Sequence, residues 1–188
     1  MEDVFVPNER TFTFFVSKTF HPSPLSLLPR GMFALSVSAV TIGIARAAIE
    51  SLVELAATKN AAGTRVLMRE SPDVQLAVAQ ADGLCSAARA YVREISGEIW
   101  RTCMDGGSPS LEQRLRLRAA SVTAPQLCSQ AVDLVWRAAG PASIRESNVL
   151  ERCFRDVHAA TQHVAVSDAM LYDTGRGLLG LEPHIQPL

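Results

Sequence analysis

The chain has 188 residues, of which 48% are apolar and only 6% are aromatic, and its formal net charge is −1. A chain of this length can bury a hydrophobic core as one domain. Abundant alanine and few aromatic residues favour close packing of helices over a β-sandwich. Because the charges nearly balance, there is no basic field to attract nucleic acid, and we expect no nucleic-acid partner.

The sequence shows no signal for export or for a membrane span. Its first ten residues, MEDVFVPNER, are acidic and lack the basic and apolar segments of a signal peptide. The longest uncharged run, Gly31–Ala45, is interrupted by serine, threonine and glycine. This run is shorter than the ~20 apolar residues that a membrane-spanning helix needs. We therefore expect no membrane partner.

The four cysteines lie far apart in the sequence and form no CxxC pair. They are Cys85, Cys103, Cys128 and Cys153. A zinc site needs ligands that short loops can bring together, so we expect no metal site. Each cysteine falls within a helical pattern, which predicts buried free thiols, and reduced thiols indicate a cytoplasmic location.

Residues 1–30 are predicted to be a remnant of a β-domain followed by a linker. Residues 4–15, VFVPNERTFTFF, are rich in β-branched and aromatic residues around a Pro-Asn pair, which predicts a strand, a turn and a second strand. A lone strand pair is marginal in water, so the rest of its sheet is expected outside this chain. Residues 19–30 contain three prolines and are predicted to be extended.

Residues 31–188 are predicted to form a helical bundle with a tail. The first helix, Met32–Lys59, is apolar on several faces, which indicates that protein should surround it. The second begins at Pro72 with Ser71 as its N-cap and ends before Gly106. Each of these boundaries follows from a capping residue or a helix breaker, so two long helices are expected here.

Two further helices follow in the sequence. The third begins near Ser110 and continues to Trp136, contains a kink at Pro125, and stops at the Gly140-Pro141 pair. The fourth extends from about residue 148 to residue 174, where a break is compatible with the pattern. Four helices with short or medium connections predict an all-α fold, a four-helix bundle preceded by the short β remnant.

Two segments resemble the acyl-CoA dehydrogenase superfamily. VFVPNERTF is similar to the end of the middle β-domain, and AVDLVWRAAGPASIRESNVLERCFRDVHAATQH is similar to the last part of the carboxy-terminal bundle. The residues that match without gaps are Gly140, Glu151, Arg152, Arg155 and Asp156. The resemblance covers residues 3–182 and implies a flavoprotein, a homodimer or homotetramer, and missing domains before residue 1.

Within the superfamily, this chain is more similar to the two-component flavin-dependent monooxygenases (group D) than to the true dehydrogenases. Many dehydrogenases carry a glutamate base eight residues after the Arg-Asp pair, and that position here is Val164, which cannot accept a proton. The preceding His163 matches the histidine beside the flavin in the monooxygenases. An imidazole N–H there could stabilise negative charge on oxygen, so His163 is the predicted catalytic residue.

The resemblance also implies candidate cofactor-binding residues. Arg65 and Gln75 lie near positions where dehydrogenases contact FAD from a neighbouring subunit, although the spacing departs by about one residue. Gly140 would let the backbone approach a ligand closely. Arg155 and Asp156 are further candidates for cofactor binding. On a continuous helix, Arg152, Asp156, Ala159 and His163 would share a face. The alternative interpretation of this face is a surface Arg–Asp pair with a structural histidine above it.

These observations favour the carboxy-terminal part of a flavin-dependent monooxygenase. Such an enzyme would use reduced FMN or FAD from a flavin reductase, together with O2, on a small organic substrate. One alternative is an acyl-CoA dehydrogenase that oxidises a CoA thioester with FAD. Another is a non-catalytic bundle that serves only for oligomerisation. In the first two cases the isolated chain is expected to be an inactive part of the enzyme.

Overall fold

The computed structural model describes residues 3–11, 23–61 and 63–184, and these residues are mainly helical. The α-helices in them are α1 (Ala34–Thr58), α2 (Pro72–Met104), α3 (Leu111–Ala139), α4 (Val149–Thr161) and α5 (Leu171–Leu178). Within the described ranges the only β pairing is an isolated bridge between Asn60 and Leu67. The predicted all-α class is confirmed for this part of the chain.

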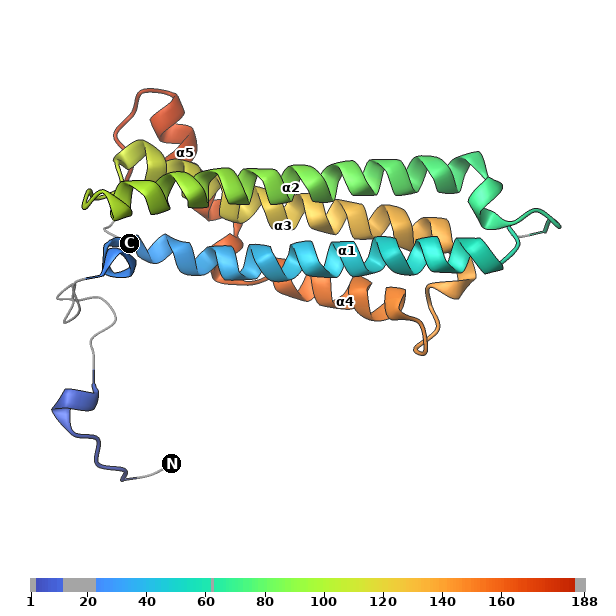
Figure 1. The fold of residues 1–188 in the computed structure, drawn as a ribbon, viewed down its shortest axis with the longest axis horizontal. Helices are drawn as coiled ribbons and strands as arrows, with labels where there is room; N and C mark the ends of the chain where they lie inside the picture. The colour runs from blue at the N-terminus through green and yellow to red at the C-terminus, as the bar shows by residue number, and fades with distance from the viewer. Residues whose placement is uncertain (1–2, 12–22, 62, 185–188) are drawn as a thin grey trace.

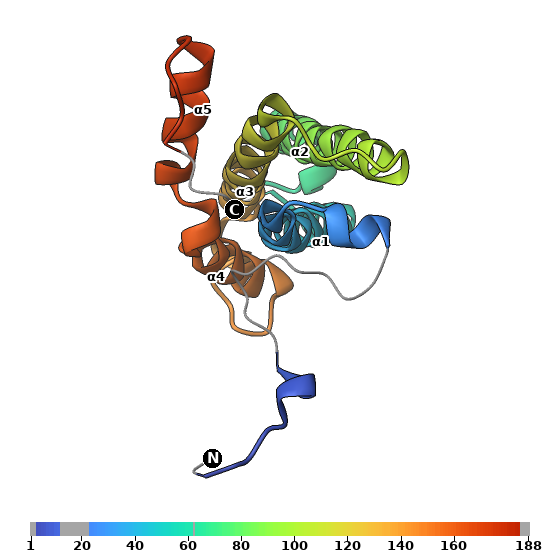
Figure 2. The same ribbon diagram turned by 90° about the vertical axis from the view of Figure 1, so that its left-hand side faces the viewer.

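Helix α3 lies at the centre of the arrangement and contacts each of the other helices. The long helices α1, α2 and α3 lie side by side, and the shorter α4 packs along α1 and α3 (Figure 1). Helix α5 lies outside this group, against α3 (Figure 2). The predicted fourth helix is therefore two helices, of which only α4 belongs to the bundle.

The main core is built by four helices together. Fully buried representatives are Leu52 of α1, Ala88 of α2, Val132 of α3 and Val157 of α4. Many core positions are alanines, whose small side chains let the helix backbones approach closely. A second cluster, which includes Ile99 and residues of α1 and α3, extends the core toward the carboxyl end of α2. Burial of these apolar side chains is the main stabilising contribution to the fold.

Helix α1 is enclosed by protein on one side only. Its inner face contacts α2, α3 and α4, whereas Phe33, Val40 and Val53 are exposed. By length and composition alone, residues 31–58 are apolar enough to cross a membrane, and 33% of the most apolar window is buried in this chain. A core helix meets the same criterion, and the contacts of α1 with three other helices are those of a core helix.

The strand pair predicted at the amino terminus is not found in residues 4–11. Val4, Phe5 and Val6 are exposed and pair with no strand in the described residues, and Asn8–Arg10 forms a 3-10 turn. The rest of the predicted pair, residues 12–15, lies outside the described residues. A strand needs a neighbour for its backbone hydrogen bonds, and the described part of the chain provides none.

Helix α3 begins and ends as its capping residues predict. The Ser110 hydroxyl accepts a hydrogen bond from the Gln113 backbone N–H at 3.2 Å, and the Gln113 side chain accepts one from Ser110 N–H at 2.9 Å. This reciprocal pair is a capping box. At the other end, Gly140 has φ +59° and ψ −141°, a conformation that glycine adopts far more easily than other residues.

Helix α4 ends at Thr161, earlier than a continuous helix would. The imidazole Nδ1 of His163 accepts a hydrogen bond from Ala165 N–H at 3.2 Å. In a continued helix that N–H would donate to the Thr161 carbonyl. The side chain therefore competes with the helix for its next donor, and two short 3-10 turns, Val164–Val166 and Asp168–Met170, precede α5.

The proline inside α3 is compensated by a side chain of α1. Pro125 has no N–H, so the carbonyl of Ser121 loses its helical donor. The Ser38 hydroxyl donates to that carbonyl at 3.2 Å, and both serines are buried. A break in the hydrogen bonding of one helix is thus filled by the helix packed against it.

Replacement of Ser38 by alanine should destabilise the fold by about 1–2 kcal/mol, because a buried carbonyl then has no donor. In a Pro125→Ala background the restored N–H can serve Ser121, so the cost of Ser38→Ala should become smaller. Urea unfolding followed by circular dichroism measures both values as a double-mutant cycle. Ser36→Ala is the matched control, since Ser36 is exposed and bonds to Phe33 in its own turn. An equal cost in both backgrounds would contradict this account.

Candidate functional site

A groove of about 520 Å³ lies between α1 and the carboxyl end of α4. Its lining residues are Ser36, Val37, Val40, Ala159, Ala160, Gln162 and His163. The valines of α1 make one wall apolar, whereas Gln162 and His163 bring an amide and an imidazole to the other wall. No carboxylate is among the lining residues. The groove can accept a flat apolar ligand, and its polar wall can donate a hydrogen bond to the edge of that ligand.

The backbone of the following turn orients the His163 imidazole. Because the Ala165 N–H can only donate, the Nδ1 atom that accepts from it must be unprotonated. A neutral ring with this hydrogen bond carries its proton on Nε2. His163 is exposed, and Nε2 has no partner among the described residues. The Nε2–H group is therefore available to a ligand in the groove.

Arg155 and Asp156 lie on the exposed side of α4 and line neither the groove nor the second pocket described below. Arg155 pairs with Glu151 of the same helix at 3.4 Å, and Asp156 has no ion-pair partner among the described residues. The predicted common face with His163 is wrong in one respect: α4 ends at Thr161, so His163 lies beyond the helix.

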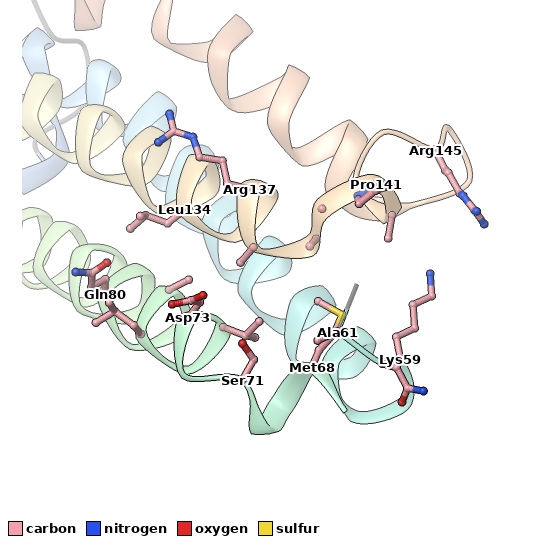
Figure 3. A pocket seen from close by; sticks show the side chains of 18 residues that line it. Lys59, Ala61, Met68, Ser71, Asp73, Gln80, Leu134, Arg137, Pro141 and Arg145 are labelled. Atoms are coloured by element: carbon pink, nitrogen blue, oxygen red, sulfur yellow. The ribbon is translucent and has the colours of Figure 1, made fainter. Parts of the chain in front are cut away.

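A second pocket, of about 680 Å³, lies at the end of the bundle where α1 and α3 finish and α2 begins (Figure 3). Ser71 and Asp73 bring the first turn of α2 to it, and Gly140 and Pro141 bring the end of α3. The unpaired N–H groups of a helix start attract anions. No atom lies within 4 Å of where a β-carbon of Gly140 would stand, so this backbone is open to a ligand.

The second pocket carries a surplus of positive charge. Lys59, Arg137 and Arg145 line it, and Asp73 is the only acidic lining residue. None of these cations forms an ion pair with a described residue. In Figure 3, Lys59 and Arg145 extend on the same side of the pocket. Unpaired cations beside a helix start make this pocket suited to a phosphate or diphosphate group. We call it the cationic pocket.

The structure brings only one of the five residues predicted to bind the cofactor into this pocket. Gly140 lines it, but Arg65 and Gln75 do not. Arg65 is exposed in the loop that joins α1 to α2, and the Gln75 amide donates to the Arg69 carbonyl at 3.0 Å. The three cations of the pocket were not among the predicted residues. Two of them, Arg137 and Arg145, lie on either side of the Gly140-Pro141 turn, and this is the local sequence pattern that could have indicated them.

The predicted buried free thiols are confirmed. All four cysteines are buried and unpaired, and burial raises the pKa of the Cys128 thiol to about 12. Thiols in this state are poor nucleophiles and poor metal ligands. No group of three or more His, Cys, Asp or Glu side chains that could hold a metal ion occurs in the described part of the chain. The candidate chemistry therefore rests on the groove and the cationic pocket.

Known proteins similar in sequence to this chain are monooxygenases or oxygenase components. The chain is 29% identical to indole-3-acetate monooxygenase of Acinetobacter baumannii, over 97% of this chain and 47% of that protein. It is 29% identical to the oxygenase component of p-hydroxyphenylacetate 3-hydroxylase from the same species, over 82% of this chain and 37% of that protein. The chain thus spans about half the length, or less, of these curated relatives.

Solved structures share the fold. XiaF from Streptomyces sp., in complex with FADH2 and glycerol, superposes with a TM-score of 0.80 over 88% of this chain and 43% of that one, at 24% identity. The 3-HSA hydroxylase from Rhodococcus sp. RHA1 gives a TM-score of 0.78 over 87% of this chain and 41% of that one, also at 24% identity. The family model "Acyl-CoA dehydrogenase, C-terminal domain" matches residues 35–168. The chain belongs to the acyl-CoA dehydrogenase C-terminal domain family.

Proposed function

We propose that this chain is the carboxy-terminal part of a flavin-dependent monooxygenase that hydroxylates a small aromatic substrate with reduced flavin and O2. The observation that carries the proposal is the His163 imidazole, whose Nε2–H group is free to donate at the edge of an apolar groove. The relatives named above are oxygenases or their oxygenase components, which supports the same reaction class.

The residues of the groove fit a flavin ring. When bound, a reduced flavin supplies the electrons for O2. Val37 and Val40 offer an apolar surface that excludes water, which strengthens hydrogen bonds to charge that develops nearby. His163 donates from Nε2 to oxygen that gains negative charge, and its bond from Ala165 holds the ring in the required tautomer.

The dehydrogenase alternative is disfavoured by the position that would carry its base. That position is Val164, whose side chain is 71% exposed beside His163. No lining residue of the groove is a carboxylate that could remove a proton from carbon. A purely oligomeric role would not account for a groove and a cationic pocket on one small domain.

We propose that the cationic pocket holds the diphosphate of FAD, which favours FAD over FMN. Val40 beside the groove and Lys59 at the pocket are separated along α1 by roughly 30 Å, at about 1.5 Å per residue. The short ribityl chain that joins the ring and the diphosphate of one flavin cannot span this distance. Groove and pocket therefore serve different flavin molecules, and a second copy of the chain supplies the pocket in a homo-oligomer.

We propose a flavin reductase as a partner, because one relative is the oxygenase component of its enzyme, which implies a separate component that supplies the reduced flavin. The compounds for which the relatives are named, indole-3-acetate and p-hydroxyphenylacetate, support an aromatic substrate of similar size. We also propose a cytoplasmic location, which the four free cysteines support.

The proposed activity is tested on the intact protein with chemically reduced FAD and O2. Indole-3-acetate and p-hydroxyphenylacetate are the first probes, and a product that gains one oxygen atom by mass spectrometry is the expected result. Oxygen from ¹⁸O2 should appear in that product. Loss of two hydrogens from an acyl-CoA probe in the absence of oxygen would instead assign the protein to the dehydrogenases.

The cationic pocket gives a separate prediction about the cofactor. Arg145→Gln in the intact protein should weaken reduced FAD binding by about ten-fold, since a hydrogen bond to a charged group contributes ~1.5 kcal/mol. FMN carries one phosphate where FAD carries a diphosphate, so its affinity should fall by less. Anaerobic titration by flavin fluorescence measures both, and Arg152→Gln is the control because Arg152 is exposed on α4 outside the pocket. An equal loss for FMN and FAD would contradict the assignment.

A further inference from the structure

Helix α4 is attached to α3 by the side chain of His158. The imidazole Nε2 lies 3.0 Å from the Asp133 carboxylate, and Nδ1 lies 3.5 Å from the Ser129 hydroxyl. These are the only side-chain hydrogen bonds between α4 and another helix in the described residues. Both α3 partners are one turn apart on the face that α4 covers. His158 is therefore the polar attachment of α4 to α3, beside the apolar contacts of the buried Leu150, Cys153 and Val157.

Aromatic contacts hold the same imidazole from the adjacent turn. Phe154 lies edge-on to the His158 ring, with centroids 4.6 Å apart and planes at 63°. The other side of Phe154 packs against Trp136 of α3 at 4.8 Å. Such aromatic contacts contribute beyond the area that they bury. The ring is thus held by two polar groups and one aromatic neighbour, which leaves it little freedom to turn.

A hydroxyl, an imidazole and a carboxylate in this order also compose hydrolytic triads, but this cluster lacks what such a triad needs. Ser129 lies inside α3, where backbone N–H groups are used by the helix and cannot form an oxyanion hole. The Ser129 contact is at the upper limit for a hydrogen bond. The arrangement suits a clamp between helices, not a nucleophile.

The clamp lies one turn before the end of α4, where the chain turns toward His163. The Thr161 hydroxyl donates to the His158 carbonyl at 2.8 Å, and His163 N–H donates to the Ala160 carbonyl at 3.2 Å. A movement of this last turn would therefore carry His163 with it. Across the groove the facing wall is α1, which packs against α3 independently of His158.

We propose that His158 is a positioning residue for His163. Its hydrogen bonds to α3 fix the position of the last turn of α4. In that position the His163 Nδ1 accepts from Ala165 N–H, and Nε2 is left for a ligand in the groove. The effect of His158 on the position of His163 concerns this chain alone. Only its effect on the reaction rests on the proposed function. Loss of the clamp should leave α4 folded on its apolar face and release His163.

The geometric part is tested on the 188-residue chain by ¹⁵N NMR of its histidine rings. At alkaline pH, where imidazoles are neutral, His163 should show an unprotonated Nδ1 and a protonated Nε2. In His158→Phe, which keeps a ring against Phe154 but loses both hydrogen bonds, His163 should become a mixture of tautomers. His158→Gln keeps a donor toward Asp133 and should restore part of the original pattern.

Arg155→Gln is the matched control, since it removes a polar contact within α4 and leaves the clamp intact. The His184 ring serves as an internal reference. Circular dichroism must show that each variant retains its helices, and an unfolded His158→Phe is replaced in the test by Asp133→Asn. An unchanged His163 pattern in a folded clamp variant would overturn the proposal.

The consequence for the reaction is measured on the intact protein. His158→Phe should raise the share of reduced flavin that ends as hydrogen peroxide about ten-fold, because small displacements of a reacting group are costly. His158→Gln should recover part of the coupling. If the NMR pattern changes but neither His158→Phe nor His163→Ala alters coupling, the proposed function fails while the clamp stands. If only His163→Ala alters coupling, the clamp proposal fails.

Discussion

His163→Ala should divert the reduced flavin of the proposed monooxygenase from hydroxylation to the release of hydrogen peroxide. The variant removes the Nε2–H donor at the edge of the groove, where an apolar wall makes a preorganised donor effective. Comparable donors contribute roughly 3–4 kcal/mol, so hydroxylation should slow by about 10²–10³. Reduced flavin should still be consumed. Oxygen uptake, peroxide and hydroxylated product, measured in one reaction, give the coupling directly.

Gln162→Ala is the control for His163→Ala, since Gln162 lines the same groove without the orienting bond to Ala165. It should change flavin affinity more than coupling. Val164→Glu should not create a dehydrogenase, because a base also needs the reacting carbon within reach. Full coupling in His163→Ala would remove this histidine from the mechanism and leave its role to the chain turn after α4.

Asp173→Ala should release α5 from the bundle while α1–α4 stay folded. The Asp173 carboxylate pairs with Arg118 of α3 at 3.1 Å, and only 13% and 14% of the two side chains are exposed. It also accepts a hydrogen bond from His184 N–H at 2.8 Å. Removal of one partner of a buried pair costs about 3 kcal/mol. Since α5 has eight residues and none of them is fully buried, the loss should be local.

The expected measurement is an increase of about 10² in amide exchange over residues 171–184, which corresponds to the same ~3 kcal/mol. Asp168→Ala is the control, because that exposed carboxylate bonds to Gln126 on the surface and should leave α5 protected. The double variant Arg118→Leu/Asp173→Leu should recover part of the protection, since it removes both buried charges together. A uniform loss over all helices would contradict the local account.

Local patterns in the sequence were sufficient for most of the helices. The capping box of Ser110 and Gln113, the N-terminal Pro72 and the glycine after α3 each act within one turn, so the ends of α2 and α3 could be predicted closely. The same holds for the buried cysteines, which follow the apolar stripe of their helices. The family could be inferred because Gly140 and the Arg155-Asp156 pair belong to one continuous segment of the chain.

The end of α4 could not be predicted from the periodicity of apolar residues. Whether His163 accepts the Ala165 N–H or the helix continues is decided by one side chain against one backbone bond, a difference of about 1 kcal/mol. In residues 4–11 the predicted amino-terminal strand is not formed, for a different reason. Its pattern suits a strand, but a strand forms only against a neighbour, and the described residues of this chain contain none.

Only the tertiary structure could bring together the residues of the two candidate sites. Lys59 and Arg145 are far apart in the sequence. Both line the cationic pocket because α1 and α3 finish at the same end of the bundle. His158 and Asp133 meet because α4 folds back along α3. Amphipathic patterns specify which face of each helix is buried, since that depends on neighbours three or four residues away. Which exposed side chains then face one another depends on how the helices pack, and that is a property of the assembled core.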